Sequence, residues 1–530
     1  MTTSCSDDSA CSSQVATSST RTISRAWQAS CARLPDKTAL ICGDRQVNHG
    51  ELATLVVALV CVLKDAGISP GDRVVIYLEN SIEFAVSMLA IFELQAVFVP
   101  MSSQTRSDKL AFVLEDTQAR VLISQTSLSR ALPEAAVSST RVTTIMVDQV
   151  LTTAWPQSDT RDTTQSGSAL ERLPTQGIPC AAEEDLAAII YTSGTTGYPK
   201  GVMLSHGNIH ASRCNVQSYL ELREQDVIGV ALPLAFSYGL YQLIMGLWIG
   251  ASIVIERNAM FPVVMLKSWE KHRVTVFPGV PTLFNSLMAQ DLSAYDLQSL
   301  RLITNAGAAP NEKTISELRQ VFPQAQLFLM YGLTECKRAS YLPPEDLNSR
   351  PTSVGKGLPR QRHWLLDKQN REVLPGSIGQ LVVAGEHVMK GYWRRPLDTA
   401  DALRAAPDGT LALFTGDLFR SDADGYLYFI GRNDDMIKSR GEKVSPLEVE
   451  RAICELPEVL DAAVTGVADE LLGMAVRAYV RLLPGAELPE RAVIRHCMAR
   501  LDSVMVPKSI VFVDELPLTD SGKVRRASLG

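Results

Sequence analysis

From Arg73 onward, short apolar runs alternate with amphipathic stretches. Runs such as RVVIYL (73–78), VTVFPGV (274–280) and AQLFLMY (325–331) are rich in valine, isoleucine and leucine. Stretches such as SIEFAVSMLAIFELQ (81–95) and NEKTISELRQVF (311–322) repeat apolar residues at helical spacing. Strands that alternate with helices form parallel sheets covered on both faces. We therefore predict an α/β fold that binds ligands at the carboxyl ends of its strands.

The length of the chain and a change of pattern near residue 431 predict two domains of unequal size. A chain of 530 residues exceeds what one hydrophobic core normally supports. We predict a disordered, Ser/Thr-rich tail over 1–22, without the apolar segment of a secretion signal. A large domain of parallel-rich sheets covered by helices is predicted over 23–433, and a small, mobile α+β C-terminal domain over 434–530.

One segment, 227–255, carries no charged residue and is long enough to be considered as a membrane span. Pro233, Gly239, Gly246 and Gly250 interrupt it. Its three pieces are typical of a buried strand, a buried helix and a second strand. We therefore predict no integral membrane association.

Composition excludes several classes of partner and site. The net charge of −7 gives no basis for binding nucleic acid or an acidic membrane surface. The 10 cysteines form no C-x-x-C pair, which indicates reduced thiols in the cytoplasm, and Cys336 is predicted to pack in the core. The seven histidines show no metal-ligand spacing.

Residues 191–202, YTSGTTGYPKGV, form a loop suited to an anion. Gly194 and Gly197 let backbone N–H groups approach a phosphate closely, and the hydroxyls and Lys200 add donors and charge. Lys200 is followed by Gly201, so the loop is not the G-x-x-x-x-G-K-[ST] loop of NTPases. A bare Gly/Ser/Thr turn is commonly a linker. The apolar strand that precedes residues 191–202, together with Lys200, favours a phosphate site over a linker.

The segment TSGTTGYPKGV (192–202) resembles the phosphate loop of the adenylate-forming superfamily, which includes acyl-CoA synthetases, peptide-synthetase adenylation domains and luciferases. Further matches follow in that family's order: YGLTE (331–335), TGD (415–417), GRNDDMIKSRGEKVSPLEVE (431–450) and PLTDSGKVRR (517–526). The resemblance spans most of the chain. It implies that ATP and a carboxylic acid give an acyl-adenylate and pyrophosphate. A thiol, of CoA or of phosphopantetheine on a carrier protein, then takes the acyl group.

The same resemblance implies a role for each matching residue. The glycine-rich loop would hold the β- and γ-phosphates, Thr334 the α-phosphate and Glu335 the Mg²⁺ ion, whose preference for oxygen ligands suits a carboxylate. The turn at 307–309 and Tyr331 would hold adenine, and Asp417 and Arg432 the ribose. The implied nucleotide and cofactor residues are Thr192, Ser193, Gly194, Thr195, Thr196, Gly197, Lys200, Gly307, Ala308, Ala309, Tyr331, Gly332, Thr334, Asp417, Arg432, Lys438, Gly441 and Lys443.

Catalysis and domain motion are also implied by resemblance. Lys523 would bridge the carboxylate and the α-phosphate, and Lys200, Thr334 and Glu335 would assist it. Asp434 matches the family's hinge, about which the small domain rotates after adenylation. Lys438, Gly441 and Lys443 would then face the pantetheine arm. Lys443 is equally well explained as a surface charge at the start of a helix. A solvated terminal lysine is the alternative for Lys523, and its place in the motif PLTDSGK favours the catalytic role.

The acid itself is less constrained. In LPLAFSYGL (232–240), Phe236 stands where many acyl- and aryl-CoA ligases have histidine, and Ser237 where peptide synthetases have an ammonium-binding aspartate. A hydroxyl cannot pair with a buried ammonium as a carboxylate does, so we predict a simple carboxylic acid. The predicted pocket, Phe236, Ser237, Tyr238 and Val280, suggests an aliphatic or aromatic acyl group. The alternatives are an amino-acid adenylation enzyme that loads a carrier protein in trans, an adenylate-powered oxygenase and a non-catalytic binding protein.

Overall fold

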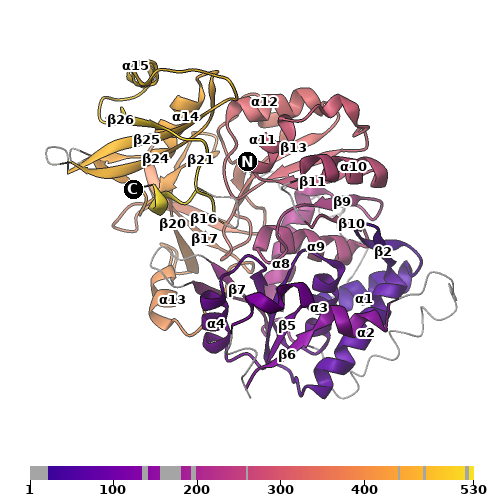
Figure 1. Ribbon diagram of the computed structural model, residues 1–530. Coiled ribbons are helices and arrows are strands. Elements are labelled where there is room, and N and C mark those ends of the chain that lie inside the picture. Colours follow the sequence, from indigo (N-terminus) through magenta and orange to yellow (C-terminus); the bar gives the residue numbers. More distant parts are fainter. Residues whose placement is uncertain are drawn as a thin grey trace, which may run out of the picture.

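The computed structural model describes residues 22–133, 141–155, 181–192, 199–257, 261–439, 442–469, 473–519 and 524–529. The predicted tail, 1–22, lies outside these residues except for Thr22, which precedes the first helix. Figure 1 shows the N-terminal half (indigo to magenta) packed as one body, with the C-terminal elements grouped at one end.

The first sheet has the strand order β15-β14-β13-β12-β11-β9-β10-β1-β2. Its strands from β13 to β1 run parallel, whereas β2, β14 and β15 are antiparallel at the edges. This arrangement brings the carboxyl ends of β9, β11, β12 and β13 to one edge. The bounds are β1 (Thr38–Cys42), β2 (Arg45–Asn48), β9 (Val227–Val230), β10 (Ser252–Ile255), β11 (Val276–Gly279), β12 (Leu302–Asn305), β13 (Gln326–Tyr331), β14 (Ser340–Leu342) and β15 (Lys356–Gly357).

The second sheet has the order β18-β8-β7-β4-β3-β5-β6, with β7, β4, β3, β5 and β6 parallel. Strand β7 turns back into antiparallel β8, with Thr192 opposite Lys200, so the phosphate loop is the connection of a hairpin. Residues 193–198 of that loop lie outside the described residues. The bounds are β3 (Arg73–Leu78), β4 (Val97–Ser102), β5 (Val121–Ser124), β6 (Thr143–Met146), β7 (Leu186–Thr192), β8 (Lys200–Ser205) and β18 (Gly391–Tyr392).

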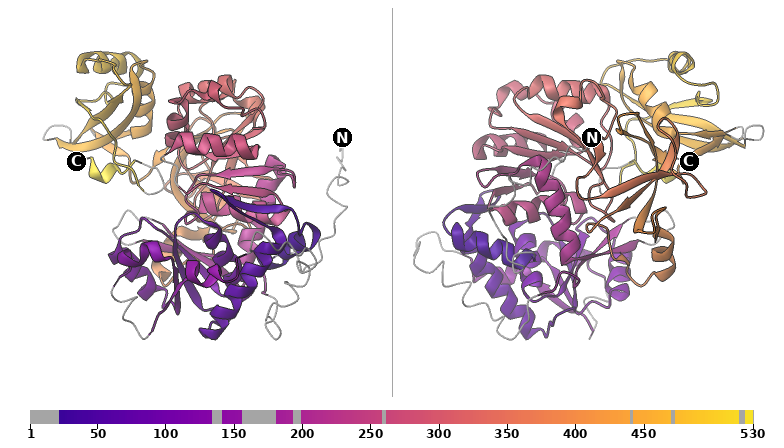
Figure 2. Two further views of the ribbon diagram at one scale, coloured as in Figure 1. Left: turned by 45° about the vertical axis from the view of Figure 1, so that its right-hand side comes forward. Right: turned by 180° about the vertical axis from the view of Figure 1, so that it is seen from behind.

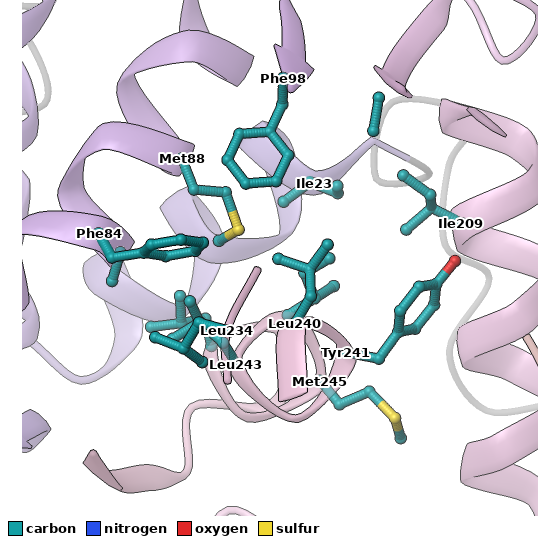
Figure 3. Close-up of a cluster of buried hydrophobic side chains, with 14 of the residues drawn as sticks. Ile23, Phe84, Met88, Phe98, Ile209, Leu234, Leu240, Tyr241, Leu243 and Met245 are labelled. Carbon is teal, nitrogen blue, oxygen red and sulfur yellow. The ribbon is translucent and has the colours of Figure 1, made fainter. Parts of the chain in front are cut away.

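Apolar helices pack between and around these sheets. In Figure 3, Leu240 and Leu243 of α9 lie near Phe84 of α3, in the same buried cluster as Phe98 of β4. Ser81 begins α3 by accepting a hydrogen bond from the Phe84 N–H, a regular N-cap. The helices are α1 (Ile23–Arg33), α2 (His49–Asp65), α3 (Ile82–Glu93), α4 (Ser107–Asp116), α6 (Val147–Thr152), α8 (His206–Leu220), α9 (Ser237–Ile249), α10 (Pro262–His272), α11 (Pro281–Met288), α12 (Glu312–Val321) and α13 (Pro396–Ala402).

The uncharged segment 227–255 forms β9, α9 and β10, which confirms the predicted strand, helix and strand. Because α9 is surrounded by buried side chains of both sheets, its apolar character comes from the protein core. Among the described residues, none of the helices has the length and apolar character needed to span a bilayer.

A third, antiparallel sheet was not predicted from the sequence. Its order is β16-β17-β20-β19, with β21 paired to β20. Asp417 on β20 faces Arg432 on β21 in register, so this sheet brings together two residues of the predicted ribose site. The bounds are β16 (Arg362–Leu366), β17 (Ile378–Ala384), β19 (Leu403–Ala405), β20 (Leu411–Ser421) and β21 (Leu427–Arg432).

The C-terminal elements form a small α+β domain with its own core, as predicted. Both views in Figure 2 show it (orange to yellow) standing apart from the indigo N-terminal elements. Its sheet has the order β23-β22-β25-β24, and β26 pairs with β25. The bounds are β22 (Ile437–Ser439), β23 (Glu442–Val444), α14 (Pro446–Cys454), β24 (Val459–Asp469), β25 (Gly473–Leu482), α15 (Glu490–Arg500) and β26 (Ser509–Phe512).

A buried histidine in the large domain predicts sensitivity to acid. His387 is 1 % exposed, and neither ring nitrogen has a hydrogen-bond partner among the described residues. Burial lowers its pKa from 6.5 to about 4. Its neutral form is therefore favoured in the folded state, which stabilises the fold above pH 6.5. That contribution, about 3 kcal/mol, is lost as the pH falls toward 4.

We expect His387→Leu, which cannot take up this proton, to lose less stability over that range. Thermal midpoints of the variant and the wild type, measured from pH 7.5 to pH 4.5 by calorimetry, check this. If the thermal midpoints of the variant and the wild type fell equally between pH 7.5 and pH 4.5, the assignment of this acid sensitivity to His387 would be wrong.

Candidate active site

A cavity of about 2220 Å³ lies at the carboxyl ends of the first sheet, facing the third sheet and the small domain. It brings together residues predicted from motifs far apart in the sequence. Those that line it are Thr192, Lys200, Phe236, Ser237, Tyr238, Val280, Gly307, Ala308, Ala309, Tyr331, Gly332, Thr334, Glu335, Asp417, Arg432, Asp434 and Lys438. Ser193, Gly194, Thr195, Thr196, Gly197, Gly441 and Lys523 lie outside the described residues. Lys443 lies on β23.

One wall of the cavity centres on Asp417, which is 3 % exposed. The Tyr331 hydroxyl donates to Oδ2 of Asp417 at 2.5 Å, and Nε of Arg432 lies 3.2 Å from Oδ1. Burial, followed by the charge of Asp417, raises the pKa of Tyr331 well above its usual value, so the phenol stays a donor. The ring of Tyr331 packs edge-on against Phe419, with centroids 4.8 Å apart. A buried carboxylate acceptor and an aromatic face therefore lie side by side.

The turn after β12 forms the neighbouring wall. Gly307 has φ +90°, a left-handed conformation that favours glycine, and a Cβ there would lie 3.7 Å from Val280. Ala308 and Ala309, which follow, are exposed. Small residues in this turn leave the backbone accessible, and a flat ring could lie against it.

Lys200 and Glu335 form a third part of the cavity lining. Lys200 forms an ion pair with Asp398 and lies 5.3 Å from the ring centroid of Tyr392. The Tyr392 hydroxyl donates to Oε1 of Glu335 at 2.9 Å. Tyr392 and Asp398 were not predicted from the sequence, because they lie 57 and 198 residues from their partners and belong to none of the motifs.

On the acyl side, Ser237 begins α9, and its Oγ lies 3.4 Å from Oγ1 of Thr334. The hydroxyl of Tyr238 donates to the Thr304 carbonyl at 2.9 Å, which fixes the ring against β12. Phe236, Ser237 and Tyr238 are all half-buried. Ser237 therefore connects the predicted pocket with the YGLTE motif.

Two basic residues directly after that motif also line the cavity and were missed. Lys337 and Arg338 are each 4 % exposed. Burial, followed by the nearby charge of Arg338, lowers the pKa of Lys337 well below its usual value. Cys336, which precedes them, is fully buried, as predicted. Only a three-dimensional structure reveals that this basic pair points inward.

The connection between the two domains contains Asp434, which is exposed in the turn between β21 and β22. Lys438 follows on β22 and is also exposed. Both residues line the cavity. Chain segments that enter and leave this turn thus belong to different sheets.

Comparison with known protein families gives the same assignment for both parts of the chain. The model of the AMP-binding enzyme family matches residues 27–393, and that of the AMP-binding enzyme C-terminal domain matches residues 448–523. The chain belongs to the AMP-binding enzyme family. The resemblance proposed from the motifs is thereby confirmed, and the cavity is the candidate active site of an AMP-binding enzyme.

Relatives of this AMP-binding enzyme include acid–CoA ligases along nearly its whole length. Indoleacetate–CoA ligase of Aromatoleum aromaticum is 32% identical over 93% of this chain and 94% of its own. Feruloyl-CoA synthase of an Amycolatopsis species is 32% identical over 95% of this chain and 97% of its own. The crystal structure of ATP-bound MatB from Rhodopseudomonas palustris has 29% identity and a TM-score of 0.83, covering 96% and 98% of the two chains. The protein is an AMP-forming acid–thiol ligase.

Proposed function

We propose that this ligase activates a carboxylic acid without an α-ammonium group and transfers the acyl group to CoA. The observation that carries the proposal is the shared cavity, in which Ser237 lies against Thr334 and Tyr331 against Asp417. An acid held at Ser237 would have its carboxylate next to Thr334, the proposed α-phosphate contact. Adenine and ribose would occupy the wall formed by Tyr331, Asp417 and the turn at 307–309.

The choice of acid is supported by charge. Amino-acid adenylation needs a buried carboxylate for the substrate ammonium, and this position is Ser237. Lys337 and Arg338 line the same cavity, and these basic groups would repel the α-ammonium group of an amino-acid substrate. Two of the relatives named above are an indoleacetate–CoA ligase and a feruloyl-CoA synthase, which favours CoA over a carrier protein. A separate carrier protein stays the second candidate, because peptide synthetase modules also match, among them the dimodular nonribosomal peptide synthase of Bacillus subtilis with 29% identity.

Mg²⁺ fits the residues present. Among the described residues, no three His, Cys, Asp or Glu side chains gather into a metal site. Mg²⁺ takes few protein ligands and keeps phosphates and waters, so a single carboxylate is a suitable partner for it. Glu335, oriented by Tyr392, would hold it. When bound, the ion offsets phosphate charge. We further propose that Lys200 and the loop through Gly197 contact the outer phosphates.

The domain boundary and the second step complete the proposal. We assign 23–433 and 434–530 as the two domains, with Asp434 as hinge, because Asp434 lies exposed between two sheets. Rotation there would withdraw Lys523 and bring Lys438, Gly441 and Lys443 toward the thiol. Free cysteines in the described residues suit a reducing, cytoplasmic location.

ATP–pyrophosphate exchange over a panel of carboxylic and amino acids tests the proposal. We expect exchange with carboxylic acids, followed by thioester formation when CoA is added. Exchange with amino acids alone, or thioester formation only with a carrier protein, would establish the alternative.

A further inference from the structure

Two basic side chains, Lys337 and Arg338, are buried beside the acyl side of the cavity, each only 4 % exposed. The Arg338 guanidinium carries five N–H donors and no acceptor, and Lys337 offers N–H donors in either protonation state. Burying such groups is unfavourable unless an acceptor or an opposite charge accompanies them. The contacts of Lys337 and Arg338 therefore show whether the protein itself supplies their acceptors and counter-charge or whether a ligand would have to supply them.

The direct contacts of Lys337 are with neutral groups, and the nearby charge is that of Arg338. Its Nζ donates to the Ser237 carbonyl at 2.8 Å and lies 4.2 Å from the ring centroid of Tyr241. These contacts satisfy one of its donors and leave the side chain directed at the N-terminal end of α9. Within the described part of the chain, no carboxylate oxygen lies within 4.0 Å of this amine.

Arg338 has the same kind of surroundings. Its guanidinium lies 4.6 Å from the ring centroid of Tyr238, and Nη1 donates to the Lys337 carbonyl at 2.9 Å. Nε is buried and has no hydrogen-bond partner, and none of the described ion pairs includes Arg338. Nδ2 of Asn305, which also lines the cavity and is 2 % exposed, lacks a partner as well. Two buried nitrogen donors without a partner, Nε of Arg338 and Nδ2 of Asn305, therefore lie on this side of the cavity.

The backbone holds the two cations in an uncommon conformation. Lys337 has φ +60°, in the left-handed region that a lysine rarely adopts. The Arg338 N–H donates to the Cys336 carbonyl at 2.7 Å, which closes a tight turn around Lys337. Strained residues of this kind concentrate at ligand sites. The turn places both side chains on the cavity wall.

Ser237 locates this wall relative to the reacting atoms. Its Oγ lies 3.4 Å from Oγ1 of Thr334, and its carbonyl accepts from Lys337 at 2.8 Å. Ser237 therefore contacts both the Lys337 amine and Thr334, the proposed α-phosphate contact. An anion bound there would lie a few carbon atoms from the carboxylate that reacts.

We propose that the acid substrate carries a second carboxylate on a short carbon spacer, and that Lys337 and Arg338 bind this carboxylate. The inference rests on the proposed function and names its substrate class. A second carboxylate accepts hydrogen bonds from both cations and supplies their missing counter-charge. The predicted apolar pocket residues, Phe236, Tyr238 and Val280, would then contact the spacer.

Matched pairs of acids test this in ATP–pyrophosphate exchange with the full-length enzyme. Succinate is compared with butanoate, glutarate with pentanoate and adipate with hexanoate. We expect kcat/KM for the dicarboxylate to exceed that of its partner about 100-fold in at least one pair. Arg338→Met should remove most of that preference by lowering kcat/KM for the dicarboxylate far more than kcat/KM for the monocarboxylate. Arg371→Met, which changes an exposed arginine outside the cavity lining, is the matched control.

Ser237→Asp gives a second, independent variant if Arg338→Met does not fold. It adds a negative charge at the residue whose carbonyl accepts from Lys337, and we expect this charge to weaken dicarboxylate activation more than monocarboxylate activation. Better exchange with monocarboxylates in the wild type, or an unchanged preference in a folded variant, overturns the inference while the proposed function stands. No exchange with any acid overturns both.

Discussion

Replacing Lys523 by alanine is expected to lower ATP–pyrophosphate exchange about 1,000-fold while ATP still binds. A carboxylate and the α-phosphate repel each other, and an ammonium between them offsets this charge most in the transition state. Lys523 lies outside the described residues, so the prediction depends on the motif PLTDSGKVRR and on the match of the C-terminal family model to residues 448–523. Exchange assays and equilibrium ATP binding on the same preparations measure the two quantities separately.

A lysine elsewhere in the same domain provides the control. Lys508 is 57 % exposed, pairs with Asp469 at 2.5 Å and does not line the cavity, so Lys508→Ala should exchange at nearly the wild-type rate. Lys523→Ala should also convert a supplied acyl-adenylate to the thioester within a few-fold of wild type, because the lysine is assigned to the first step only. Equal losses in both steps, or wild-type exchange, would remove Lys523 from this role.

The regular elements of the large domain were predictable because their signals are local. In the segment 227–255, the interrupting Pro233 and Gly250 separate pieces whose lengths suit a strand and a helix. The structure places β9, α9 and β10 there. The position of ligand-binding loops at strand ends followed from the parallel order alone.

Contacts between distant segments were not predictable in this way. Tyr392 reaches Glu335 across 57 residues, and Asp398 reaches Lys200 across 198. Tyr392 and Asp398 are ordinary polar residues in their local sequence. Tyr392 lies on β18 of the second sheet and Glu335 after β13 of the first sheet, whereas Lys200 lies on β8 and Asp398 on α13, so both pairings depend on how distant elements pack. The third sheet was missed because three of its strands, β16, β19 and β21, are short and only partly buried, so their local pattern is weak.

The acyl side illustrates a different limit. The motif YGLTE ends at Glu335, and a basic pair that follows a motif is usually a solvated surface feature. Burial of Lys337 and Arg338 arises from a turn with φ +60° and from the neighbouring tyrosines of α9, neither of which has a local signature. The sequence therefore suggested an apolar acyl group where the structure adds two cations.

Asp417→Ala is expected to lower kcat/KM for ATP by about 100- to 1,000-fold, mainly through KM. Hydrogen bonds to a charged group contribute about 1.5–3 kcal/mol each, and this carboxylate is proposed to accept from both ribose hydroxyls. Its removal also leaves the Tyr331 hydroxyl without its 2.5 Å acceptor, so the adenine wall loosens together with the ribose contact.

Steady-state kinetics at varied ATP check the Asp417 prediction, with Asp408→Ala as control. Asp408 pairs with Arg362 on the same sheet, is exposed and does not line the cavity, so its loss should leave the KM for ATP unchanged. Arg432→Met should have a smaller effect than Asp417→Ala, because Arg432 is 47 % exposed and water replaces its contact. A wild-type KM for ATP in folded Asp417→Ala would contradict the ribose assignment. The cluster of Tyr331, Asp417 and Arg432 would then only connect the first sheet to the third.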